Sequence, residues 1–376
     1  MAPIDPVELT RALVRCPSVT PDASGALDLV EAAVRPLGFA CHRLRFAAVD
    51  NLFAQLGSVG PCFAFAGHVD VVPPGDRGLW SVDPFAGDIR DGQLWGRGAA
   101  DMKSGVACAV AAVAAFLERH GAPRGSLALI ITGDEEGPAI DGTARVLDWA
   151  TAHGHRFDAC LVAEPTSVER LGDVLKIGRR GSAVGRLVAH GRQGHTAYPQ
   201  RADNAAHRLV AALHAMLTTP LDAGSPHFEP SNLQLTTIDI GNPASNVIPA
   251  RAEARFNIRY NDRHDTASLL AWLQARCAAA GGSVAVELTS SGDAFLTPPG
   301  RFTDLVVAAV TEVTGRRPEL STSGGTSDAR FIRHLCPVVE LGLVGTTMHQ
   351  ADEHVTIADI HGLTEIYTRI LELWFG

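Results

Sequence analysis

The chain has 376 residues, of which 46% are hydrophobic and 19% charged, a composition typical of a soluble globular protein with a sizeable core. Its formal net charge of −9, without a Lys/Arg cluster, disfavours a nucleic-acid-binding surface. The seven Cys residues are widely spaced without a Cys-x-x-Cys pair, so the sequence predicts reduced thiols in a cytoplasmic protein rather than a disulfide framework.

The first half of the chain alternates apolar strands with helices. Helical spacing predicts helices at residues 5–15, 26–37 and 143–153, and in an Ala-rich segment that ends near His120. Short apolar runs predict strands at residues 51–56, 62–66, 127–132 and 159–163. The longest apolar stretch, 106–117, is too short to span a bilayer, and the N-terminus resembles no signal peptide, so we expect no membrane segment.

Three of these strands are followed by acidic or His residues. His68 follows the strand at 62–66, Glu135 and Glu136 follow the strand at 127–132, and Glu164 follows the strand at 159–163. Alternating strands and helices predict an α/β sheet with helices on both faces. Ligands in such sheets bind outside the carboxyl ends of the strands, so we expect a functional site there.

The pattern changes near residue 180. Alternating polar and apolar residues predict antiparallel strands at 182–189, 233–240, 251–259 and 284–288, with helices at 204–217 and 266–280. From residue 302 the strand–helix pattern returns, with helices at 304–313 and before His334 and a strand at 338–343. We therefore expect a discontinuous domain, 1–179 and 292–376, and an inserted α+β domain, 180–291.

Five residues of the metal-binding types are expected at the same edge of the sheet: His68, Asp101, Glu136, Glu164 and His349. Two imidazoles and three carboxylates suit a pair of zinc ions with one carboxylate between them. Adjacent side chains point different ways, so Glu135 is free to face the substrate as a general base. Each residue taken singly is also compatible with a solvated acid at a strand end; the set favours a metal site.

His68 and Asp70 form a second pattern at the end of the strand. Residues two apart on a strand face the same way, so the Asp70 carboxylate is expected to reach the imidazole and select its tautomer.

Four motifs resemble the successive signatures of the M20 metallopeptidase family. They are Gly-His-Val-Asp-Val-Val-Pro at 67–73, Gly-Arg-Gly-Ala-Ala-Asp-Met-Lys-Ser-Gly at 96–105, Asp-Glu-Glu-Gly at 134–137 and Glu-Pro at 164–165. The resemblance extends over nearly the whole chain. It implies a zinc-peptidase-like catalytic domain with a mixed sheet flanked by helices, and an inserted ferredoxin-like lid through which a homodimer forms. It further implies hydrolysis of an amide of a small molecule, with two Zn²⁺ per subunit, for which Co²⁺ substitutes.

The resemblance also implies individual roles. His68 and Glu164 bind one zinc, Glu136 and His349 the other, and Asp101 bridges them, with a cis peptide to Met102. Asp70 orients His68, and Glu135 is the general base. From the lid, His195 reaches the partner subunit's active site and stabilises the oxyanion. Contacts with substrate are implied for Arg179, Tyr198, Asn246, Arg259, Gly325 and Thr326.

One position departs from the family pattern. Gly345 stands where some members carry Asn, so a substrate contact there has to come from the backbone or from elsewhere. Other amidohydrolases and carboxypeptidases of the same family are the nearest alternative, and substrate trials separate them. A catalytically silent binding protein is expected to lack the base or a ligand, and a purely structural protein has no reason to carry acids at strand ends.

Overall fold

The computed structural model describes residues 3–281 and 283–376. Two compact units are present: unit 1 comprises Met1–Ile177, Thr297–Ser321 and Ser327–Gly376, and unit 2 comprises Gly178–Leu296 and Thr322–Thr326. The sequence places 322–326 in the catalytic domain, whereas the structure packs this stretch in unit 2. The physical reason is local, since the hydroxyl of Thr322 donates to the backbone carbonyl of His227 in unit 2.

Unit 1 is built on an eight-stranded mixed sheet with the order β1-β2-β6-β3-β7-β18-β8-β17. Its strands are β1 Ala40–Phe46, β2 Val49–Leu56, β3 Cys62–His68, β6 Ser126–Thr132, β7 Ala159–Val162, β8 Val174–Lys176, β17 Glu319–Ser321 and β18 Val338–Glu340. The neighbours β6, β3 and β7 run parallel and are buried throughout, as expected for strands covered on both faces. A smaller sheet joins β4 Asp88–Arg90, β5 Gln93–Trp95 and β19 His354–Thr356.

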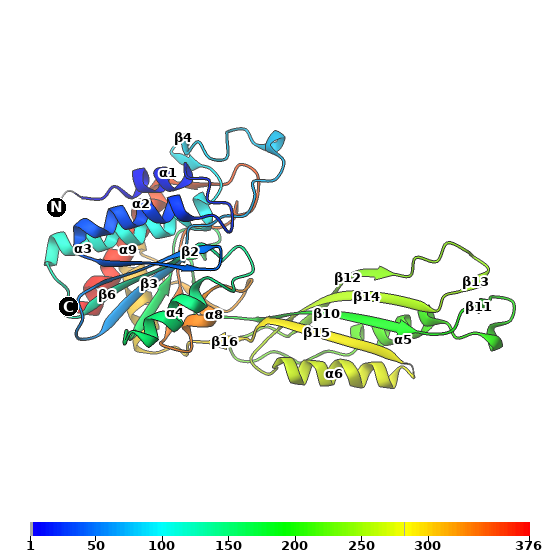
Figure 1. Ribbon diagram of the computed structural model, residues 1–376. Coiled ribbons are helices and arrows are strands. Elements are labelled where there is room, and N and C mark those ends of the chain that lie inside the picture. Colours follow the sequence, from blue (N-terminus) through cyan, green and yellow to red (C-terminus); the bar gives the residue numbers. More distant parts are fainter. Residues whose placement is uncertain (1–2, 282) are drawn as a thin grey trace. The chain divides into compact units, whose positions relative to one another are not determined.

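Helices cover both faces of the large sheet, as the strand–helix alternation predicts. In Figure 1, α2 and α3 lie on one side of β2, β3 and β6, and α4 and α8 lie on the other. The helices of unit 1 are α1 Pro6–Val14, α2 Ser24–Val34, α3 Ser104–His120, α4 Thr143–Ala152, α7 Arg301–Thr314, α8 Ala329–Ile332 and α9 Ile357–Phe375.

The Ala-rich helix α3 forms part of the core of unit 1. With the turn before it, the segment Ala99–His120 is long and apolar enough to cross a membrane by length and composition. However, 89% of its most apolar window is buried inside the protein. Its apolar character is therefore accounted for by packing within unit 1.

Unit 2 contains a four-stranded antiparallel sheet with the order β12-β14-β10-β15 and two helices. The elements are β10 Gly181–His190, α5 Ala205–Leu217, β12 Asn232–Asp239, β14 Arg251–Tyr260, α6 Thr266–Ala279 and β15 Val284–Gly292. Alternate residues of β10 and β14, such as Leu187 and Phe256, join Leu209 and Leu269 of the helices in one buried core. Two short pairs complete the unit: β9 Gly178–Arg179 with β16 Phe295–Leu296, and β11 Gly194–His195 with β13 Val247–Ile248.

Candidate metal centre

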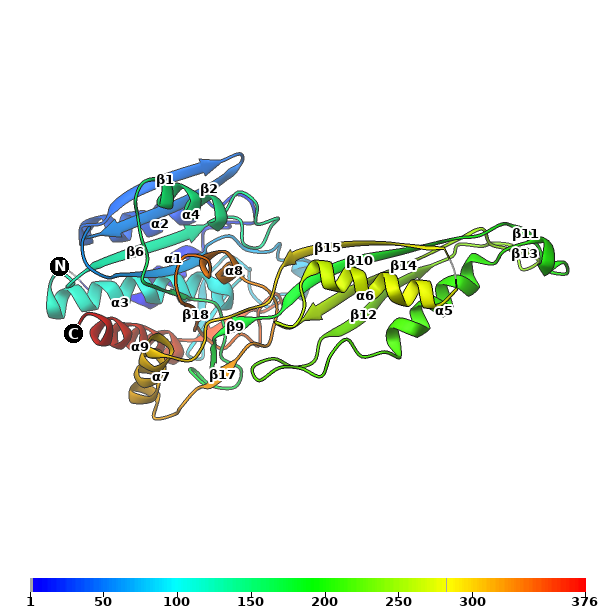
Figure 2. The ribbon, with the colours of Figure 1, turned by 90° about the horizontal axis from the view of Figure 1, so that it is seen from below.

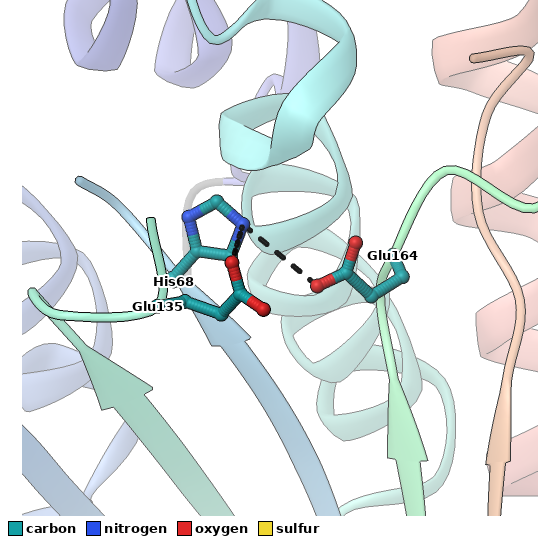
Figure 3. Close-up of side chains that lie close together, drawn as sticks. All are labelled: His68, Glu135 and Glu164. Atoms are coloured by element: carbon teal, nitrogen blue, oxygen red, sulfur yellow. Dashed lines mark ion pairs between the residues drawn. The ribbon is translucent and has the colours of Figure 1, made fainter. Parts of the chain in front are cut away.

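The carboxyl ends of β3, β6 and β7 bring the first three site residues together. His68 is the last residue of β3 and pairs in register with Thr132, the last residue of β6. The segments that leave β6 and β7 therefore start beside His68. Figure 3 shows the side chains of His68, Glu135 and Glu164 directed toward one another. Nε2 of His68 lies 3.8 Å from Oε1 of Glu164 and 4.0 Å from Oε2 of Glu135.

Asp101 faces two imidazoles at once. It lies in the turn Ala99–Lys103 before α3, and its peptide bond to Met102 is cis. One carboxylate oxygen, Oδ1, is 3.2 Å from Nε2 of His68, and the other, Oδ2, is 3.4 Å from Nε2 of His349. A carboxylate with one oxygen toward each imidazole has the geometry expected of a bridge between two cations.

His349 and Glu136 form the second half of the cluster. His349 lies between β18 and β19, and its Nε2 is 2.8 Å from Oε1 of Glu136. Glu135 and Glu136 thus approach different imidazoles, as the sequence predicts for adjacent side chains. All five residues that the sequence groups as ligands meet in unit 1.

Asp70 contacts His68 through a different atom from the one the sequence predicts. Its backbone carbonyl accepts from Nδ1 of His68 at 2.9 Å, whereas the nearest carboxylate oxygen is 3.5 Å from Nδ1. The strand already ends at His68, so the same-face rule for strands does not extend to Asp70. The buried carboxylate instead accepts from the backbone N–H groups of Glu135 at 3.2 Å and Glu136 at 3.1 Å. Asp70 therefore orients the imidazole of His68 so that its Nε2 faces the cluster. It also orients the loop that carries Glu135 and Glu136.

The cluster carries an excess of negative charge. Within residues 3–281 and 283–376, no Lys or Arg forms an ion pair with Asp101, Glu135, Glu136 or Glu164. Burial, and then the carboxylates of Asp101 and Glu135, raise the pKa of Glu164 well above its ordinary value. Hydrogen bonds to Asp101 and Glu136 raise the pKa of His349 to about 10. Carboxylates crowded in this way are stabilised by a bound cation.

The donor atoms suit divalent metal ions. Two groups each have ligand atoms within 4.8 Å of one another: His68 with Glu135 and Glu164, and His68 with Asp101 and Glu136. Imidazole nitrogens and carboxylate oxygens are the ligands that zinc and similar cations prefer. Both groups contain His68, whose Nε2 can serve only one ion. A second position is supplied by His349, whose Nε2 lies 2.8 Å from Glu136 and 3.4 Å from Asp101. With His349 included, the residues fit a two-metal site, and Glu135 lies within reach of one of its positions.

Two buried acids beside the cluster have no role in the sequence prediction. Asp328 accepts from the hydroxyl of Thr143 at 2.6 Å. Burial raises the pKa of Glu135 to about 8, with His68 opposing and Asp328 adding to the rise. Glu353 accepts hydrogen bonds from the turn that carries Asp101. In the sequence, Asp328 directly follows the Gly-containing stretch Ser-Gly-Gly-Thr-Ser at 323–327, and Glu353 comes shortly after His349.

The remaining predicted site residues all lie in unit 2: Arg179, His195, Tyr198, Asn246, Arg259, Gly325 and Thr326. His195 is exposed, and its Nδ1 accepts from the backbone N–H of Ala197 at 3.1 Å, so the neutral ring carries its proton on Nε2. The Tyr198 ring is 5.7 Å from the His195 ring, and the carbonyl of Asn246 accepts from the backbone N–H of Thr196.

Arg179, also in unit 2, contacts another of the predicted residues. Its Nη1 donates to the carbonyl of Gly325 at 3.3 Å. Arg259 lies opposite Ser182 near the start of β10, and burial and the neighbouring Arg180 lower its pKa. Figure 2 shows β9, which carries Arg179, and β11, which carries His195, at opposite ends of β10. The ten residues of β10 separate these ends by about 30 Å, at roughly 3.3 Å per residue.

Comparison with known proteins agrees with this architecture. The model of peptidase family M20/M25/M40 matches residues 64–373. Succinyl-diaminopimelate desuccinylase of Rhodospirillum centenum is 60% identical over 381 residues, covering 100% of this chain and 98% of the relative. The protein of the same name from Rhodospirillum rubrum is 58% identical over 389 residues, covering 99% and 98%.

Solved structures show the same fold at low sequence identity. Aminopeptidase PepT from Bacillus cereus superposes with a TM-score of 0.81 at 20% identity, covering 98% of this chain and 97% of that one. YXEP from Bacillus subtilis, described as a dinuclear metal-binding peptidase of family M20, has a TM-score of 0.71 at 14% identity, covering 98% and 97%. The mixed sheet flanked by helices, predicted from the sequence, is confirmed. With its family model matched over most of its length and relatives of high identity over all of it, the chain belongs to peptidase family M20/M25/M40.

Proposed function

We propose that the chain hydrolyses the amide bond of N-succinyl-LL-2,6-diaminopimelate to succinate and LL-2,6-diaminopimelate, in the cytoplasmic synthesis of lysine and diaminopimelate. Family membership makes it a metal-dependent amide hydrolase. The observation that carries the proposal is the cluster in which one carboxylate, Asp101, faces both His68 and His349. Relatives at 58–60% identity over the full length support this choice of substrate.

The proposed cofactor is a pair of Zn²⁺ ions, with Co²⁺ as a substitute. His68 and Glu164 would hold one ion, Glu136 and His349 the other, and Asp101 would contact both. When bound, two such cations polarise the scissile carbonyl and lower the pKa of water.

Glu135 is the proposed general base. Its carboxylate belongs to the cluster but lies farther from Nε2 of His68 than the oxygens of Asp101 and Glu164 do. It accepts a proton from the attacking water and transfers that proton to the leaving amine. The carboxylate of Asp70 accepts a hydrogen bond from the backbone N–H of Glu135. The position of the proposed base is therefore fixed before substrate binds.

Unit 2 supplies the proposed substrate contacts. The guanidinium groups of Arg179 and Arg259 suit the substrate's carboxylates. Gly325, Thr326, Tyr198 and Asn246 are assigned further contacts by the family resemblance. His195 would stabilise the oxyanion, for which a neutral ring with its proton on Nε2 has the required donor.

The extent of unit 2 supports a homodimer. Arg179 and His195 are about 30 Å apart along β10. An extended N-succinyl-diaminopimelate is on the order of 15 Å long from ordinary bond lengths. This separation, measured along the backbone, argues against one subunit offering both residues to the same substrate molecule. If both act on one substrate, His195 comes from the partner's unit 2.

The glycine at position 345 favours considering a second class of substrate. A Cβ at this position would lie 3.2 Å from Cβ and from the carbonyl oxygen of Pro165, so the loop is packed closely against the residue after Glu164. Without a side chain, position 345 offers no side-chain amide donor to a succinyl group. The alternative is an N-acetyl amino acid, as for acetylornithine deacetylase, or the substrate of another aminoacylase or carboxypeptidase of the family.

The test is a direct comparison of two amides. Release of primary amine is measured from N-succinyl-LL-diaminopimelate and from N-acetylornithine, with the zinc-loaded protein and with the same protein after chelation. We expect turnover of the succinyl compound, its loss with chelator and its return with added Zn²⁺. Preferential turnover of N-acetylornithine would contradict the proposed substrate, and full activity after verified metal removal would contradict the metal assignment.

A further inference from the structure

Glu353 concentrates four hydrogen-bond donors on one buried carboxylate. Its Oε2 accepts from the guanidinium of Arg97 and from the backbone N–H of Gly98 at 3.1 Å. Its Oε1 accepts from the backbone N–H groups of Ala100 at 2.8 Å and Asp101 at 3.1 Å. The side chain of Glu353 has no exposed surface. An ionised carboxylate has about four acceptor positions, so these donors saturate it.

These contacts join two segments that are distant in the chain. Asp101 and Glu353 are 252 residues apart. The backbone of Glu353 also accepts from the N–H of Gly96 at 2.8 Å, and the next residue begins β19, which pairs with β5. His349 belongs to the loop that leads into Glu353. One carboxylate thus fixes the turn that carries Asp101 against the loop that carries His349.

The turn has little intrinsic stability of its own. Gly98 adopts a φ of +84°, and a Cβ at this position would lie 2.5 Å from Cγ1 of Val71. The dihedral angles of Asp101 itself are not helical. Without an external acceptor, the buried N–H groups of Gly98, Ala100 and Asp101 would be unsatisfied, which is unfavourable. The Glu353 carboxylate supplies that acceptor.

We infer that Glu353 is a positioning residue that holds the carboxylate of Asp101 between His68 and His349. The inference rests on the proposed function, in which Asp101 contacts both metal ions. In the described part of the chain, the side chain of Glu353 hydrogen-bonds to neither imidazole. It acts on the backbone nitrogen of Asp101, which is bonded directly to the Cα that carries the Asp101 side chain. Groups that orient ligands in this way typically change metal affinity or activity by about 10–100-fold when substituted.

The test compares Glu353→Gln with a variant that lowers stability elsewhere. Glu353→Gln keeps the shape but removes the charge and places an amide NH₂ against backbone N–H donors. Leu363→Ala, at a fully buried position of α9, is the control for loss of stability alone. Each metal-free protein is titrated with Co²⁺, followed by the visible absorption of the bound ion, and its unfolding temperature is measured.

We expect Glu353→Gln to bind Co²⁺ about 10–100-fold more weakly than the wild type and to lose kcat in the same range, with little change in KM. Leu363→Ala should unfold at a lower temperature and bind Co²⁺ as the wild type does. Wild-type Co²⁺ affinity and kcat in Glu353→Gln would overturn the inference, as would equal weakening of Co²⁺ binding in both variants.

A milder variant covers the case in which Glu353→Gln does not fold. Glu353→Asp keeps the charge but is shorter by one methylene group, so it cannot reach all four donors, and we expect weaker Co²⁺ binding in the same direction. Wild-type affinity in Glu353→Asp would also overturn the inference. The titration needs no substrate, so inactivity of the wild type on the succinyl compound would count against the proposed function and leave the test of Glu353 intact.

Discussion

Adjacent residues of the acidic loop serve different parts of the cluster. The carboxylate of Glu135 faces His68, and that of Glu136 contacts His349. Both backbone N–H groups are held by the carboxylate of Asp70. The buried carboxylate of Asp70 therefore fixes the backbone from which both side chains extend. The two side chains then reach different imidazoles. This arrangement lets the proposed base and the proposed ligand be adjacent in sequence without competing for one position.

Glu135→Gln separates the role of base from that of ligand. Gln has the shape of Glu but cannot accept the proton of the attacking water, so activity should fall by about 10²–10⁴-fold while metal content stays near that of the wild type. Activity and metal content per subunit are measured on the same samples. Glu136→Gln is the matched control and should lose metal. If Glu135→Gln loses metal to the same extent, Glu135 is a metal ligand. Its proximity to His68 and Glu164 is compatible with that role.

Asp101→Ala tests the bridge. The carboxylate has one oxygen toward each imidazole, so its removal should disturb both metal positions rather than one. Metal analysis after dialysis should show fewer than two ions per subunit, with loss of activity. Asp83→Ala, at an exposed position, is the control and should keep the wild-type content. Two tightly bound ions and normal turnover in Asp101→Ala would rule out a bridging role.

At the scale of elements, α3 approaches the end of β7 very closely. Gly105, in the first turn of α3, has so little space that a Cβ would lie 2.3 Å from the carbonyl oxygen of Ala163 and 3.0 Å from its Cβ. Ala163 directly precedes Glu164. The helix and the strand end therefore meet through a glycine, and the position of Glu164 depends on that contact. The Gly at the end of the motif 96–105 thus has a packing reason.

Gly105→Ala should force α3 and the end of β7 apart. Overpacking of this kind costs about 1–3 kcal/mol of unfolding free energy, and we expect weaker metal binding because Glu164 is displaced. Denaturant unfolding and metal content are the measurements. Gly300→Ala makes the same change at the N-cap of α7, where a Cβ would come no closer than 3.8 Å to the carbonyl oxygen of Pro298. It should leave the metal content unchanged and lower stability less than Gly105→Ala does. Equal stability of the two variants would show that the contact at Gly105 relaxes without cost.

At the scale of the whole molecule, the proposed functional residues are divided between two units. The ligand cluster and Glu135 belong to unit 1, and His195 belongs to unit 2, which has a core of its own. The backbone positions of Arg179 and His195 are about 30 Å apart along β10, which argues against both reaching one small substrate from the same chain. The proposed homodimer is the arrangement in which both take part.

Subunit mixing tests this arrangement. His195→Ala and Glu135→Gln are each expected to be nearly inactive. After exchange at equal amounts, half the dimers are mixed, and each mixed dimer has one site with an intact Glu135 and an intact His195 from the other chain. About a quarter of the wild-type activity should return if sites act independently. Each variant incubated alone is the control. If mass-labelled subunits exchange and no activity returns, His195 does not complete the partner's site.

The sequence by itself determined the elements and the residue types of the site. Apolar runs, helical spacing and glycines are local signals, and they located β3, β6, β7 and α3 and the acids that follow the strands. The sequence did not predict β1, whose residues are half-exposed, or the three-residue strands β8 and β17, because their local patterns are too weak.

Only the tertiary structure decided which of these residues meet and through which atoms. The order β6-β3-β7 places His68 beside both acidic segments. Asp70 binds His68 through its carbonyl, and Glu353 reaches the turn of Asp101 across 252 residues of chain. Such contacts depend on the register of paired strands and on the path of the loops between them. Neither leaves a periodic trace in the sequence, because the free energy that selects them comes from packing and hydrogen bonding between segments that are far apart in the chain.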